Sequence, residues 1–65
     1  MQLSHHAQQR ICERNLSLQD VALTLDYGVV IKEKSTTQRV TLERNGIWVV
    51  ATTGWEPYVI TVFEK

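Results

Sequence analysis

Residues 4–17 read SHHAQQRICERNLS, and we expect the rest of the chain to be organised around this stretch. It contains neither Gly nor Pro, and Ser4 belongs to the residue types that cap helix N-termini well. Leu3, Ala7 and Ile11 recur at the spacing of one helix face. These features predict a first helix that begins after Ser4, ends near Asn15 and packs through an apolar stripe.

A row of polar side chains borders that stripe. His6, Arg10 and Arg14 are spaced i, i+4, i+8 and stack along one side of the helix. His6 can act as a general acid or base near neutral pH, and the arginines can bind a phosphate and stabilise transition-state charge. In the structural alternative, His6 hydrogen-bonds the helix start or the sheet, and the arginines form ion pairs. Arg14, near the centre of the apolar face, fits that alternative better than Arg10.

Residues 17–28 predict a second helix. Ser17 and Asp20 resemble a capping box in which Asp replaces Glu. Apolar residues follow at i, i+3, i+4 and i+7, which is a core-facing pattern; they are Leu18, Val21, Ala22 and Leu25. Gly28 is placed to end the helix in a left-handed cap. Cys12 is expected to be a small buried residue between the two helices.

After the second helix, the spacing of the apolar residues changes from the period of a helix to that of β-strands. Four strands are expected, at residues 29–34, 38–44, 47–53 and 58–63. Asn45-Gly46 is a strong signal for a two-residue type I′ hairpin. That turn sets Leu42 opposite Val49 in the paired strands.

The resulting fold is a single α+β domain over residues 1–65, with two N-terminal helices packed on a four-stranded antiparallel meander sheet in the order ααββββ. The sheet face under the helices should carry Val40, Leu42, Val49 and Ala51. If Tyr58, Ile60 and Val62 of the last strand join the core, the opposite face also shows Val59, Thr61 and Phe63. The opposite face would expose Trp48 and Val50, and such apolar surface predicts a protein partner or a homodimer through the exposed sheet face.

Composition narrows the function classes. Seven Lys and Arg balance seven Asp and Glu, which speaks against a general nucleic-acid binder. Residues 1–14 nevertheless hold two Arg and two His against one acid, so a local basic patch is expected. Adjacent histidines diverge on a helix and Cys12 is the single cysteine, so we expect no metal site and no cofactor. Neither a membrane-spanning run nor a secretory pattern is present, and we expect a cytoplasmic protein without a membrane partner.

The pattern Ser4-x-His6-Ala7-x-x-Arg10-x-x-Glu13-Arg14-x-Leu16-Ser17 resembles the opening motif of a family of small bacterial proteins, domain-of-unknown-function family 4258. The closing residues 59–63 are similar to that family's last strand. The family looks like a compact relative of the RelE/ParE-type toxins, which place a helix pair on a sheet. The resemblance implies a polar site of His6, Arg10 and Arg14, with Thr61 contributing from the sheet.

These observations lead to one hypothesis and one alternative. The hypothesis is a toxin-like, metal-free endoribonuclease of RelE-like fold that uses His6, Arg10 and Arg14 as catalytic residues and binds RNA also through Arg39 and Thr61. The neutral net charge is unlike that of the basic RelE-type enzymes, which argues against ribosome-dependent messenger cleavage. The alternative is a non-catalytic interaction module that binds an antitoxin-like protein or a second copy.

Overall fold

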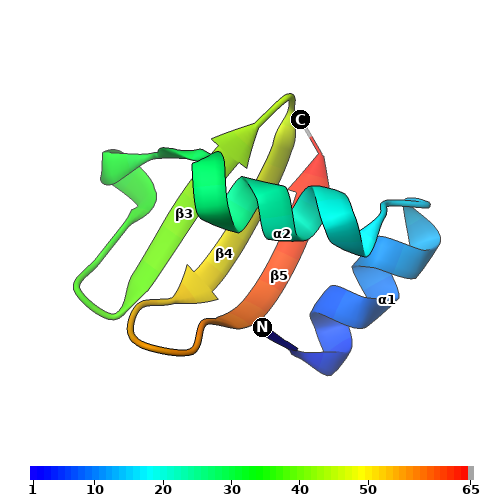
Figure 1. Cartoon of the computed structure of the whole chain (residues 1–65), viewed down its shortest axis with the longest axis horizontal. Helices are drawn as coiled ribbons and strands as arrows, with labels where there is room; N and C mark the ends of the chain where they lie inside the picture. Colours follow the sequence, from blue (N-terminus) through cyan, green and yellow to red (C-terminus); the bar gives the residue numbers. More distant parts are fainter. Residues whose placement is uncertain (65) are drawn as a thin grey trace.

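The computed structural model describes residues 1–64, which form two α-helices and a five-stranded sheet (Figure 1). The helices are α1, His5–Glu13, and α2, Leu18–Tyr27. The strands are β1, Gln2–Leu3; β2, Val29–Val30; β3, Arg39–Arg44; β4, Ile47–Thr52; and β5, Tyr58–Glu64. A short 3-10 helix, η1, Lys32–Lys34, lies between β2 and β3. The predicted α+β class is confirmed.

The sheet has the strand order β1-β5-β4-β3-β2. Strands β2 to β5 form an antiparallel meander, as predicted. The prediction of a purely antiparallel, four-stranded sheet is wrong because β1 adds at the outer side of β5 and runs parallel to it. The strand expected over residues 29–34 is also shorter, since β2 ends at Val30 and η1 follows.

Ser4 and Ser17 are the N-caps of the two helices, as the sequence predicts. The hydroxyl of Ser4 accepts a hydrogen bond from the Ala7 amide at 2.9 Å, and that of Ser17 accepts one from the Asp20 amide at 3.0 Å. Each bond satisfies an amide that has no partner inside the helix. The two helix starts are therefore fixed by local sequence.

The two helix ends differ from each other. Asn15 adopts a positive φ of 55°, and the Leu16 amide donates to the Ile11 carbonyl at 2.9 Å, which is the Schellman pattern. The prediction of a left-handed cap at Gly28 is wrong, because its φ is −68°. Glycine is required there by a close approach: an added Cβ would overlap the Thr24 carbonyl oxygen and lie 3.1 Å from that of Glu43.

The Asn45-Gly46 hairpin forms with the predicted register. Both residues have positive φ, 54° and 83°, as a type I′ turn requires. Leu42 pairs with Val49 across the hairpin. The Glu43 carboxylate also accepts a hydrogen bond from the Gly46 amide at 2.8 Å, which adds a local restraint to the turn.

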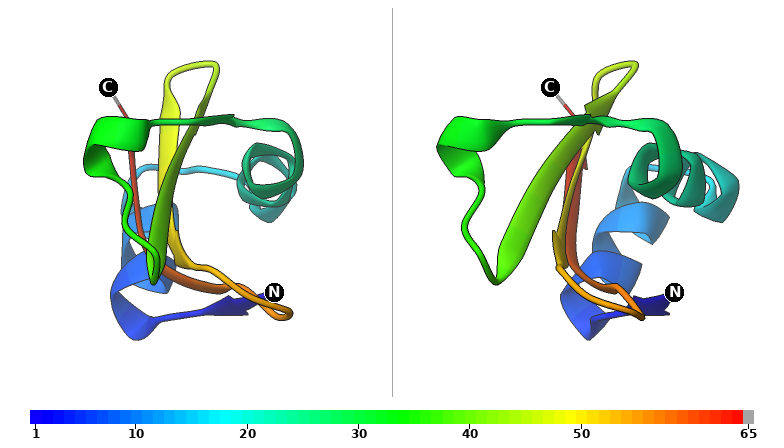
Figure 2. Two further views of the ribbon diagram at one scale, coloured as in Figure 1. Left: turned by 90° about the vertical axis from the view of Figure 1, so that its left-hand side faces the viewer. Right: turned by 60° about the vertical axis from the view of Figure 1, so that its left-hand side comes forward.

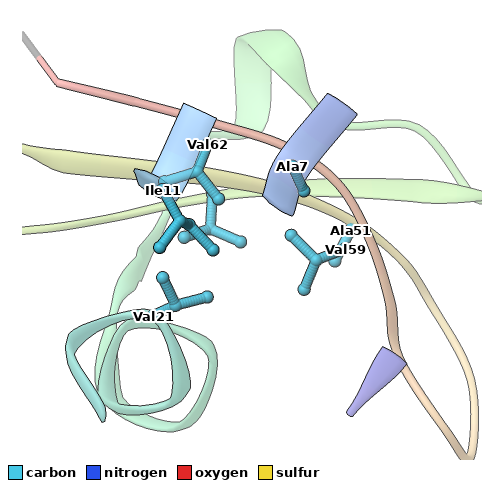
Figure 3. Close-up of a cluster of buried hydrophobic side chains, with 7 residues drawn as sticks. Ala7, Ile11, Val21, Ala51, Val59 and Val62 are labelled. Atoms are coloured by element: carbon cyan, nitrogen blue, oxygen red, sulfur yellow. The ribbon is translucent and has the colours of Figure 1, made fainter. Parts of the chain in front are cut away.

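The core lies between the helices and one sheet face (Figure 3). Its buried residues are Ala7, Ile11, Val21, Val49, Ala51, Val59 and Val62. Val59 and Val62 are both fully buried although they are three residues apart. The register explains this: Val50 pairs with Thr61 but Ala51 pairs with Val59, so Ile60 is the extra residue of a β-bulge. The alternation expected for β5 therefore breaks at Ile60.

The opposite sheet face is partly covered, because η1 lies on that side (Figure 2). Trp48 is only 9% exposed, stacks on Phe63 with ring centroids 5.7 Å apart, and lies 5.5 Å from the Lys34 ammonium. Thr41 is 3% exposed and donates to the Lys34 carbonyl at 3.0 Å. The prediction that this face exposes Trp48 for a partner is therefore wrong. Val50 is half-buried.

Replacing Gly28 with Ala should lower the free energy of unfolding by about 1–3 kcal/mol, because the added methyl group overpacks a site bounded by backbone carbonyls. Chemical denaturation measures the loss. Gly46→Asn is the control: nothing lies within 4 Å of a Cβ there, and Asn tolerates positive φ, so its loss should be smaller. A Gly28→Ala variant as stable as wild type would contradict the close-approach explanation.

Candidate functional site

Helix α1 carries the candidate site and packs along β5 at the side of the sheet opposite β2 (Figure 1). It buries only two side chains, Ala7 and Ile11. Ser4 adds polar contacts at its start: its amide donates to the Val59 carbonyl at 2.9 Å and its hydroxyl donates to the Ile60 carbonyl at 2.6 Å. The helix is thus attached to β5 at the bulge.

His6, Arg10 and Arg14 form the row that the sequence predicts. His6 and Arg10 lie within α1, and Arg14 is its C-terminal cap residue. His6 and Arg14 are exposed and Arg10 is half-buried. Neighbours in such a row are separated by about 6 Å along the helix axis. The three side chains therefore offer a line of evenly spaced hydrogen-bond donors.

The row has no protein partners in the part of the chain that the structure describes. No hydrogen bond or ion pair joins the side chain of His6, Arg10 or Arg14 to another of residues 1–64. The structural alternative, in which the arginines pair with nearby acids such as Glu13, is not what the geometry shows. Their charges remain available to an external anion.

Arg39 and Thr61 lie elsewhere. Thr61 pairs with Val50 and Arg39 pairs with Thr52, and these positions alternate with the core positions of β4. Both residues therefore belong to the sheet face that η1 partly covers, whereas α1 packs on the other face. The structure groups three of the five predicted site residues into one row and places two on the opposite face.

A surface cavity of about 410 Å³ lies on the other flank of the apolar stripe of α1. It is lined by Leu3, Gln8, Ile11, Cys12, Asn15, Leu16 and Leu18. The row His6, Arg10 and Arg14 does not contribute to it. The prediction of a buried Cys12 is wrong, because this thiol is exposed. Gln8 and Cys12 were missed as cavity residues, although their i, i+4 spacing places them on one flank of the helix.

Residues 1–64 contain no group of three or more His, Cys, Asp or Glu side chains that could hold a metal ion. Neither α1 nor α2 is long and apolar enough to cross a membrane.

The chemistry open to the row follows from its residue types. The guanidinium groups can donate paired hydrogen bonds to phosphate oxygens. An imidazole one helical turn away can give or take a proton close to that phosphate. The row is therefore suited to binding an oxyanion and to proton transfer beside it.

The comparisons with known proteins identify one family. A family model described as "Domain of unknown function (DUF4258)" matches residues 3–64, which is nearly the whole chain. No significant similarity to a curated protein or to a solved structure was found.

Proposed function

The chain belongs to the DUF4258 family, and we propose that it is a toxin-like, metal-independent endoribonuclease of the cytoplasm that uses the His6, Arg10 and Arg14 row. One observation carries the proposal: these three side chains share one helix side and have no partner among residues 1–64. A helix pair packed on an antiparallel meander also supports a relationship to RelE/ParE-type toxins.

RNA is the proposed substrate because its own 2′-hydroxyl can act as the nucleophile. In the proposed reaction, His6 accepts the proton of a 2′-hydroxyl, whose oxygen attacks the adjacent phosphorus. The bond between phosphorus and the 5′ oxygen breaks, and that oxygen takes up the proton from the His6 imidazolium. The products are a 2′,3′-cyclic phosphate and a free 5′-hydroxyl. Arg10 and Arg14 donate hydrogen bonds to the non-bridging oxygens, where negative charge builds up in the transition state.

The charge distribution fits a local site. The whole chain has a formal net charge of zero, so long-range attraction of nucleic acid is weak. Residues 1–14 contain two arginines against the single acid Glu13, and Glu13 makes no ion pair with either of them. The protein should therefore bind a short single-stranded segment through few phosphates, with a shallow dependence on salt.

Removing His6 or Arg10 should reduce RNA cleavage in EDTA by at least about tenfold, because each supplies a separate part of the catalysis. The assay compares wild type, His6→Ala and Arg10→Ala on a single-stranded RNA. Arg44→Ala is the matched control, since it removes the same charge from β3. Arg39→Ala tests whether the opposite sheet face takes part.

The folded state should survive these changes, because His6 is exposed and Arg10 has no bonded partner among residues 1–64. Circular dichroism checks this. The proposal fails if wild type neither binds nor cleaves RNA, or if Arg44→Ala loses as much activity as Arg10→Ala.

A second candidate function, self-association, is favoured by the edge strand β2. Val29 is 65% exposed and Val30 is 45% exposed, and the preceding Tyr27 is 75% exposed. No strand pairs with the outer side of β2 within residues 1–64. Open, apolar edge strands are templates for strand addition. A homodimer formed at this edge would use the β2 strand as its interface and not the Trp48 face that was predicted from the sequence.

Val29→Lys should abolish any such dimer, because a charged side chain on an edge strand opposes strand addition. Size-exclusion chromatography with light scattering at rising protein concentration measures the mass. Leu18→Lys is the matched control, since Leu18 is 54% exposed but lies on α2. A wild-type protein that stays monomeric, or a dimer broken equally by both variants, would contradict the edge interface.

A further inference from the structure

Ser4 makes more contacts than a helix cap needs. Its hydroxyl accepts a hydrogen bond from the Ala7 amide at 2.9 Å and donates one to the Ile60 carbonyl at 2.6 Å. Its own amide donates to the Val59 carbonyl at 2.9 Å. One residue therefore begins α1 and also binds two successive carbonyls of β5.

Ser17 shows what capping alone looks like. Its hydroxyl accepts from the Asp20 amide at 3.0 Å and forms no bond to the sheet among the described residues. The chain thus contains two capped helices of similar length, of which only α1 is tied to the sheet through its cap. The comparison separates the capping role of Ser4 from its attachment role.

The attachment is placed at an irregular point of the sheet. Ile60 is the extra residue of the β-bulge, so it has no strand residue opposite it on β4. A bulge interrupts the regular ladder and turns the backbone groups of the strand aside. The Ser4 hydroxyl donates a hydrogen bond to the Ile60 carbonyl at this point, so the bulge is a fixed docking position for α1.

The apolar contact of α1 does not define its rotation well. Ala7 and Ile11 are the only side chains that α1 buries, and Ala7 is a single methyl group. Hydrophobic contact is non-directional, so this stripe, with the half-buried Leu3 and Leu16 beyond the two helix ends, restricts the roll of the helix on β5 only weakly. Hydrogen bonds have preferred angles and distances, so the Ser4 bonds restrict that roll.

We propose that Ser4 is a positioning residue, which fixes the roll of α1 and thereby the direction in which His6 and Arg10 face the RNA phosphate. This inference rests on the proposed function for its effect on activity. His6 lies two residues after Ser4, and Arg10 lies about one turn further on. A small rotation at Ser4 is carried along the rigid helix and displaces both side chains from the phosphate.

The test compares Ser4→Ala, Ser4→Thr and Ser17→Ala with wild type. Both Ala variants lose a cap, but only Ser4→Ala loses the bond to Ile60. The activity readout is cleavage of single-stranded RNA, with kcat and KM determined separately. The structural readout is the orientation of α1 relative to β5, from residual dipolar couplings of the backbone amides in solution.

We expect Ser4→Ala to reorient α1 and to lower kcat at least tenfold with a smaller change in KM. Ser17→Ala should keep the α1 orientation and a kcat within twofold of wild type. Ser4→Thr retains the hydroxyl and should recover at least half of the wild-type kcat. Equal kcat for the two Ala variants, or an unchanged α1 orientation in Ser4→Ala, would overturn the positioning role.

The two proposals fail separately. If wild type does not cleave RNA, the endoribonuclease proposal fails, and the dipolar couplings alone then decide whether Ser4 orients α1. If Ser4→Ala does not fold, Ser4→Gly takes its place, because Gly is itself an acceptable N-cap and also lacks the hydroxyl. An unchanged α1 orientation in that variant would equally overturn the inference.

Discussion

The hydrogen bonds of Ser4 to the bulged strand β5 fix the start of helix α1 on the sheet. They join the start of α1 to the Val59 and Ile60 carbonyls, where the bulge reverses the alternation of β5. Because of that reversal, Val59 and Val62 both enter the core. The bulge at Ile60 therefore determines both where α1 docks and which β5 side chains enter the core. The Ser4 hydrogen bonds at this bulge help to position α1, which buries only two side chains of its own.

The small size of the chain imposes the second constraint. A domain of 65 residues buries little apolar surface, so both sheet faces need cover. The helices cover one face, and η1 with its flanking residues covers the Trp48 side through the Thr41 and Ser35 hydrogen bonds. Gly28 lets α2 pass close to β3 on its way to β2. The apolar side chains at the β2 edge remain exposed, as do His6 and Arg14 on α1.

Local signals in the sequence predicted the local structure. Ser4, Ser17 and Asn45-Gly46 act through neighbours a few residues away, so their caps and turn could be predicted, and the hairpin register followed from the turn. The His6, Arg10 and Arg14 row was predictable for the same reason, since helix periodicity alone places it.

Contacts between distant residues could not be predicted in this way. The parallel pairing of β1 involves two residues that carry no strand pattern, and the bulge at Ile60 depends on how β5 meets both β4 and Ser4. Gly28 has a backbone conformation open to other residues, and only the neighbouring carbonyls explain it. The placement of Arg39 and Thr61 away from the α1 row likewise follows from the sheet and not from their spacing.

Contact between the α1 row and the RNA backbone, which we propose, can be measured by an NMR titration. A short single-stranded RNA with a non-cleavable 2′-O-methyl backbone is added to isotope-labelled protein, and amide and side-chain shifts are followed at low salt. Binding through the row should give saturable shifts concentrated at the His6 ring, the Arg10 and Arg14 guanidinium groups and the α1 amides. Shifts confined to the β2 edge or the Trp48 face, or no saturable shifts, would contradict it.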